Sequence, residues 1–91
     1  IGLLYNPKSI LEKEFCKSFK FQLEKRNPNL KIRYNYPYLG TADGFPTYLR
    51  KKFKTNYLGI ELEINQKLLI AEKFPEELKL QIKQTLKKII C

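Results

Sequence analysis

The 91-residue sequence contains no histidine, no methionine and no tryptophan. Histidine is the side chain most often used to bind metals and to move protons near neutral pH, so either kind of chemistry needs other residues or another part of the protein. The absence of methionine, together with isoleucine at position 1, leads us to expect a segment of a longer chain.

Cysteine is scarce, and long apolar runs are missing. Only Cys16 and Cys91 are present, far apart and without a C-x-x-C pair, which indicates neither a disulfide framework nor a metal knuckle. Two ordinary thiols are typical of a reducing compartment, so we expect a cytoplasmic protein. No apolar run approaches the roughly 18 residues that a membrane span needs, and no signal-peptide pattern opens the chain.

Acidic residues are half as common as basic ones, nine against 18, which gives a formal net charge of +9. Such a balance favours acidic partners: nucleic acid, an anionic membrane surface or a substrate that carries carboxylates. The lysines are spread through every segment, as is typical of a solvated surface. The charge alone therefore does not select among these partners.

Three short apolar segments predict β-strands. The run over 1–5 ends at Asn6-Pro7, which is a turn signal. Residues 30–34 and 57–65 alternate apolar and polar side chains, as half-buried strands do. The loop from Asn35 to about Pro46 is dense in proline, glycine and aspartate, which are turn-forming residues.

Three other segments predict helices. Ser9 followed by Glu12 is a capping box, which starts a helix at about residue 10. Residues 47–54 are long enough for two helical turns, and Pro75 opens a last helix. The apolar stripes of the first and last helices contain Leu11, Phe15, Cys16, Phe19 and Leu23, and Leu78, Ile82, Leu86 and Ile89. The order β-α-β-loop-α-β-α predicts one α/β segment over 1–91, with a small three-stranded sheet flanked by helices.

Few residues in the sequence are candidates for a catalytic or ligand-binding role. Glu61 and Glu63 share one face of the predicted strand, with Cα atoms roughly 7 Å apart. They fit either a half-exposed strand or a carboxylate at the floor of a pocket, where burial or a metal tunes its pKa for proton transfer. Arg50 is either a surface cation or a bidentate ligand for a carboxylate. Gly40 and Gly44 are turn glycines whose spacing matches neither a P-loop nor a dinucleotide fingerprint.

An ordered set of motifs between Asn35 and Gln66 resembles the C-terminal part of the N-formylglutamate amidohydrolase family. That family is similar in fold to the zinc carboxypeptidases and the aspartoacylase group. The resemblance extends more loosely to the first strand and the last helix. The motifs are Asn35-x-Pro37-Tyr38-x-Gly40, then Asp43-Gly44, then Arg50, then Glu63-Ile64-x-Gln66 at the end of a strand.

The resemblance implies hydrolysis of an amide beside a carboxylate, with one zinc ion in the full-length enzyme. Glu63 would take a proton from the attacking water and return it to the leaving nitrogen, with Glu61 as the second choice. Arg50 would bind the carboxylate of a small-molecule substrate. The loop that contains Asn35, Tyr38, Gly40, Asp43 and Gly44 would form a wall of the pocket, and Tyr38 could donate a hydrogen bond there.

One departure from the family is large. The family's zinc ligands, histidines and an acidic residue, lie upstream of the matched part, and this chain has no histidine. By this resemblance the segment alone binds no zinc and is inactive. Either a missing N-terminal part of the same protein completes a larger zinc-hydrolase-like domain, or the chain is a degenerate relative.

Two other interpretations compete with a hydrolase. A nucleic-acid-binding module could use Arg50-Lys51-Lys52-Phe53-Lys54, with Phe45, Tyr48 and Tyr57 as stacking groups. Two glutamates on one strand face near that basic segment disfavour nucleic acid as a partner. A noncatalytic interaction domain is the remaining alternative.

Overall fold

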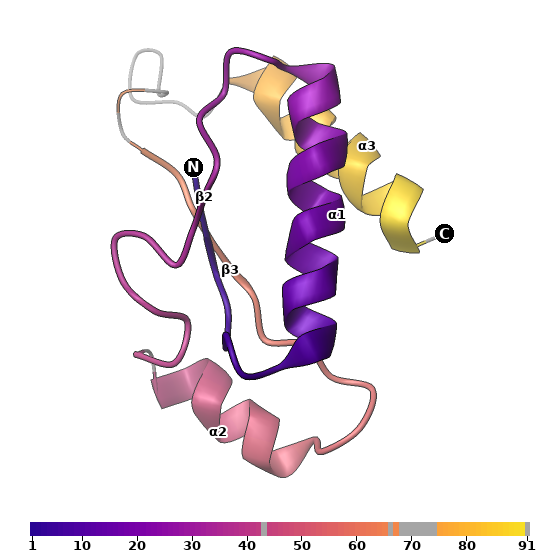
Figure 1. Ribbon diagram of the computed structural model, residues 1–91. Coiled ribbons are helices and arrows are strands. Elements are labelled where there is room, and N and C mark those ends of the chain that lie inside the picture. Colours follow the sequence, from indigo (N-terminus) through magenta and orange to yellow (C-terminus); the bar gives the residue numbers. More distant parts are fainter. Residues whose placement is uncertain (43, 66, 68–74, 91) are drawn as a thin grey trace.

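The computed structural model describes residues 1–42, 44–65, 67 and 75–90. It confirms the α/β class, with a three-stranded mixed sheet and three helices (Figure 1). The elements are β1 (Gly2–Leu4), α1 (Ile10–Arg26), β2 (Arg33–Tyr34), α2 (Gly44–Lys52), β3 (Glu61–Glu63) and α3 (Glu76–Ile90).

The sheet has the order β2-β1-β3, so β1 is the central strand. It runs parallel to β2 and antiparallel to β3, and all three of its residues are buried. The sequence predicted longer outer strands, over 30–34 and 57–65. They are shorter in the structure because a ladder extends only as far as its partner, and β1 has three residues.

Helix α1 begins as predicted, since the Ser9 side chain accepts a hydrogen bond from the backbone N–H of Glu12. The predicted apolar stripe is wrong at one end. Leu11 is 69% exposed, whereas the neighbouring Glu12 is 2% exposed and faces the interior. Glu12 can replace an apolar residue there because partners from distant segments bind its carboxylate.

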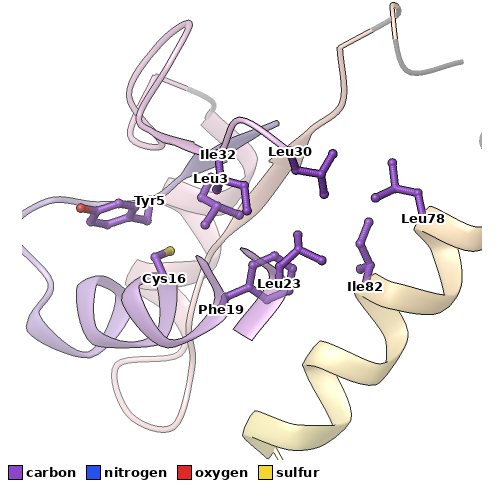
Figure 2. Close-up of a cluster of buried hydrophobic side chains, with 9 residues drawn as sticks. All are labelled: Leu3, Tyr5, Cys16, Phe19, Leu23, Leu30, Ile32, Leu78 and Ile82. Carbon is purple, nitrogen blue, oxygen red and sulfur yellow. The ribbon is translucent and has the colours of Figure 1, made fainter. Parts of the chain in front are cut away.

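The core lies between the sheet and helices α1 and α3, which pack against each other on one side of it (Figure 1). Leu78 and Ile82 of α3 are buried as predicted, and Leu86 and Ile89 pack at the edge of the cluster. Among helices in the described part of the chain, none has the length and apolar character needed to cross a bilayer. Figure 2 shows the buried cluster: Leu3, Tyr5, Cys16, Phe19, Leu23, Leu30, Ile32, Leu78 and Ile82.

Helix α2 lies at the end of the sheet where β1 turns into α1 (Figure 1). It begins at Gly44, earlier than the predicted start at residue 47. Pro46 is compatible with this start because it falls in the first turn, where a missing N–H breaks no intrahelical hydrogen bond. Its side chain is buried, whereas Phe45 and Tyr48 are exposed.

Candidate functional site

A buried ion pair joins the start of α1 to the middle of α2. The Nε atom of Arg50 lies 2.9 Å from Oε2 of Glu12, and its Nη2 atom lies 3.1 Å from Oε1. The side chains of Arg50 and Glu12 are 14% and 2% exposed. This two-point geometry is the strong form of an arginine–carboxylate contact.

The same two side chains also bind the backbone of three other segments. The Glu12 carboxylate accepts hydrogen bonds from the N–H groups of Asn6 at 2.9 Å and Gly59 at 3.1 Å. Arg50 donates to the carbonyl oxygens of Gly59 at 2.5 Å and Gly40 at 3.4 Å. We call these five residues the Glu12 cluster. It ties α1, α2 and the loop at Gly40 to the segment that leads into β3.

These partners set the pKa of Glu12. Burial alone would raise the pKa, but the hydrogen bonds from Arg50 and from the amides of Asn6 and Gly59 outweigh it. The pKa of Glu12 is therefore lowered from its ordinary value of 4.5. The fold therefore stabilises the charged form of the Glu12 carboxyl group.

The lowered pKa predicts a loss of stability in acid. A carboxyl group with a depressed pKa stabilises the fold above its unfolded-state pKa, and the contribution disappears as the pH falls through the folded-state pKa. We expect the urea midpoint of unfolding to fall as the pH drops below 4.5. Glu12→Gln should flatten this dependence, because it removes the titrating group. An equally steep acid dependence in Glu12→Gln would contradict the assignment.

Asn35 and Gly40 form a second polar contact beside this cluster. Asn35 adopts a left-handed backbone conformation with φ of 49°, and its Oδ1 atom accepts hydrogen bonds from the amides of Tyr5 at 2.9 Å and Gly40 at 3.1 Å. A Cβ atom on Gly40 would lie 2.5 Å from the Cα of Tyr5 and 2.6 Å from the carbonyl carbon of Leu4. The loop therefore packs backbone against backbone at the end of β1.

The chain offers a matched pair of glycines to test this packing. Gly40→Ala should destabilise the fold by about 1–3 kcal/mol, as overpacking typically does, because its neighbours are backbone atoms that cannot move aside. Gly44→Ala should be neutral or slightly stabilising, since a Cβ there would meet nothing within 4 Å and alanine favours a helix. Chemical denaturation of both variants measures the difference. Equal stabilities would contradict the close approach at Gly40.

The direction of β3 divides the predicted site residues between two ends of the sheet. Glu61 lies opposite Leu4, at the end that also holds the Glu12 cluster and Asn35. Glu63 lies opposite Gly2, at the other end. Glu61 is half-buried with its Oε1 atom shielded from solvent, whereas Glu63 is exposed. The sequence had placed Glu61, Glu63, Arg50 and Asn35 around one pocket.

Glu63 lines a cavity of about 700 Å³ that we call the polar cleft. Tyr36 and Pro37, from the loop predicted to form a pocket wall, line it too. The guanidinium of Arg33 lies 4.8 Å from the centre of the Tyr36 ring, in cation–π contact. The lining residues are Ile1, Gly2, Lys31, Arg33, Tyr36, Pro37, Glu63, Ile64, Asn65 and Lys67. Three cationic side chains and one carboxylate thus line the polar cleft.

The other predicted site residues that the structure describes do not line the polar cleft. Arg50, predicted to bind a substrate carboxylate, binds the Glu12 carboxylate within the chain. Tyr38 is 45% exposed, Gly44 begins α2, and Asp43 lies outside the described residues.

Sequence reasoning missed Glu12, Lys31 and Arg33 as candidates. Lys31 and Arg33 could have been found, because they alternate on one face of the predicted strand, as Glu61 and Glu63 do. Glu12 could not, because the capping box explains a glutamate at that position by itself.

The described residues do not form a metal centre. Among residues 1–42, 44–65, 67 and 75–90, no group of three or more His, Cys, Asp or Glu side chains could hold an ion. Cys16 is buried, and burial followed by the charge of Glu12 raises the pKa of its thiol to about 12. Since thiolates are the form of cysteine that binds metals, Cys16 is a core residue.

The chain matches no protein-family model, no curated protein and no solved structure.

Proposed function

We propose that this chain supplies the proton-transferring carboxylate and the substrate-binding cations of a cytoplasmic hydrolase for N-acylated amino acids such as N-formylglutamate. The observation that carries the proposal is the composition of the polar cleft. It places Glu63 among Lys31, Arg33 and Lys67, with Tyr36 beside them. A cleft of this size fits a small molecule, and its excess of positive charge fits one that bears carboxylates.

The cations account for substrate binding in this proposal. Arg33 can donate two parallel N–H hydrogen bonds to a carboxylate, because its planar guanidinium matches the spacing of the two oxygens. Its contact with the Tyr36 ring limits the orientations of the guanidinium. Lys31 and Lys67 add point charges that favour a second carboxylate on the substrate.

Glu63 accounts for proton transfer. In hydrolysis of an amide, a base removes a proton from the attacking water and an acid protonates the departing nitrogen. One carboxylate can perform both steps, because it becomes the acid after it has accepted the proton. Glu63 is exposed to the cleft, so that water and substrate can reach it.

Zinc is part of this proposal only through residues outside these 91. The donor set of the chain does not fit zinc, since it lacks histidine and its described residues contain no cluster of ligands. The roles proposed here belong to Glu63 and to the cations of the polar cleft.

Arg50, Asn35 and Gly40 take indirect roles in this account. Arg50 binds the backbone of Gly59, two residues before β3, and so positions the strand that carries Glu63. Asn35 fixes the start of the loop that brings Tyr36 and Pro37 to the cleft. They are positioning residues in this proposal, because their polar atoms are bound within the chain.

Loss of one cleft cation tests substrate binding. Arg33→Gln in the full-length protein should raise KM for N-formylglutamate by roughly tenfold or more, in line with a charged hydrogen bond, and change kcat much less. Lys17→Gln removes the same charge from the exposed face of α1 and is the matched control. A KM that changes equally in both variants would mean that only the overall charge matters, and would remove Arg33 from the site.

A further inference from the structure

Helix α2 presents one side to the interior and the opposite side to solvent. Pro46 is buried, and the side chain of Arg50, one turn later, is bound within the chain. Tyr48 is 57% exposed, and Lys51 and Lys52, three and four residues after it, are exposed as well. Residues at these spacings share one side of a helix. A tyrosine ring and two ammonium groups therefore lie together on the outer surface of α2.

Two more aromatic rings follow directly after α2. Phe53 is 49% exposed, and the Nζ atom of Lys52 lies 5.7 Å from the centre of its ring. Asn56 adopts a left-handed backbone conformation with φ of 58°, which asparagine tolerates better than most residues. The chain bends there, and the centre of the Tyr57 ring lies 5.9 Å from that of Phe53. We define the aromatic–basic patch as Tyr48, Lys51, Lys52, Phe53 and Tyr57.

The segment that carries this patch is positively charged. Residues 44–60 contain four cations and no acidic residue. Glu12 is neutralised by its ion pair, and Glu14, two residues later, projects from the opposite side of α1. Two glutamates of β3 disfavoured nucleic acid in the sequence. In the structure Glu63 lies at the far end of the sheet from α2, and Glu61 has one carboxylate oxygen shielded from solvent. Their repulsion of a polyanion at the patch is therefore reduced.

We propose that the aromatic–basic patch binds single-stranded nucleic acid. Lysine ammonium groups bind backbone phosphates, and exposed rings stack on bases that no complementary strand covers. The patch offers both kinds of contact side by side, because Lys52 follows Tyr48 by one helical turn and contacts the ring of Phe53. This inference is independent of the proposed reaction.

An anionic membrane would also attract the lysines, but helix α2 fits it less well. An amphipathic helix at a membrane buries one whole apolar face, with aliphatic as well as aromatic side chains. The inner side of α2 is already occupied by contacts within the protein, and over residues 44–57 every exposed apolar side chain is aromatic. Aromatic rings beside lysines are typical of a surface that binds single strands.

Two labelled strands test this inference by fluorescence anisotropy with the full-length protein. One is oligothymidylate, and the other is an abasic strand of equal length, which carries the same phosphates but no bases. We expect oligothymidylate to bind at least about fivefold more tightly, because stacking adds to the attraction of the phosphates. The positive charge of the chain acts equally on both strands, so this difference measures stacking.

Aromatic variants locate the stacking. Tyr48→Ala and Phe53→Ala should each weaken binding of oligothymidylate by at least about fivefold and leave binding of the abasic strand unchanged. Phe21→Ala is the matched control and should change neither. Phe21 is 59% exposed on α1, and its ring centre also lies near a lysine, 5.2 Å from Nζ of Lys25.

Charge variants locate the phosphate contacts. Lys51→Gln with Lys52→Gln should reduce the slope of log Kd against log salt concentration by about 1.4, since each phosphate contact on a single strand contributes about 0.7. Lys87→Gln with Lys88→Gln removes the same charge from the last turn of α3 and should leave the slope as it is.

Three results would each overturn the proposal. The first is equal binding of oligothymidylate and the abasic strand. The second is an equal loss of binding in Tyr48→Ala and Phe21→Ala, with circular dichroism showing both variants folded. The third is binding to phosphatidylserine vesicles that depends on Tyr48, without binding to oligothymidylate, which would assign the patch to a membrane.

Discussion

Glu63→Gln should lower kcat of the full-length protein for N-formylglutamate by about 10²–10⁴-fold, the usual range for general acid–base catalysis. Glutamine has nearly the same shape as glutamate, but its amide neither accepts a proton from water nor returns one to the leaving nitrogen. Glu63 is exposed and lines the polar cleft, so its replacement should change thermal stability by less than about 0.5 kcal/mol. A large loss of activity without a loss of stability is the expected signature.

Glu61→Gln is the matched control for this experiment. It makes the same Glu-to-Gln change on the same strand, but at the residue of β3 that lies opposite Leu4 rather than Gly2. We expect a milder, several-fold loss of kcat. An inactive Glu61→Gln with an active Glu63→Gln would move the base to the other end of the sheet. Full activity in both variants would contradict the proposed reaction itself.

Arg50→Leu should destabilise the fold by about 3–5 kcal/mol, because it leaves the Glu12 carboxylate buried without its charged partner. Small domains have only about 5–15 kcal/mol of stability, so we expect most of the protein to unfold at modest urea concentrations. Arg50→Lys keeps the charge but loses the planar fork, so its effect should be intermediate. The free energy of unfolding in urea measures all of these changes.

Two further variants separate the buried pair from general effects on the helix. Lys51→Ala removes a neighbouring, exposed cation of α2 and should leave stability nearly unchanged. The double variant Glu12→Leu with Arg50→Leu should be more stable than the sum of the single effects, because no unpaired charge remains. If Arg50→Leu left stability intact and only raised KM, Arg50 would be a substrate ligand rather than part of the Glu12 cluster.

The helices and the core were largely predictable from the sequence. Capping at Ser9 follows from local patterns, as do the stripe with Phe19 and Leu23 on α1 and the stripe with Leu78 and Ile82 on α3, and the structure confirms them. The burial of Glu12 in place of Leu11 was not predictable, because it depends on Arg50, 38 positions away in the sequence. Alternation and capping are local signals, and they carry no information about a distant partner.

The site was predictable only in part, for a related reason. Alternation on β3 correctly put Glu61 and Glu63 on one face, and the loop after Asn35 does reach the cleft through Tyr36 and Pro37. The alternation of apolar and polar side chains does not show whether a strand runs parallel or antiparallel to its neighbour. The antiparallel register with β1 therefore separates Glu63 from the end of the sheet that holds Arg50 and Asn35.

The most direct test of the account is release of formate from N-formyl-L-glutamate by the full-length protein loaded with zinc. We predict catalytic turnover by the wild type that Glu63→Gln lowers by at least about 100-fold at equal zinc content. Zinc-loaded, folded wild-type protein that releases no formate, or an equal rate of release by Glu63→Gln, would contradict the central claim.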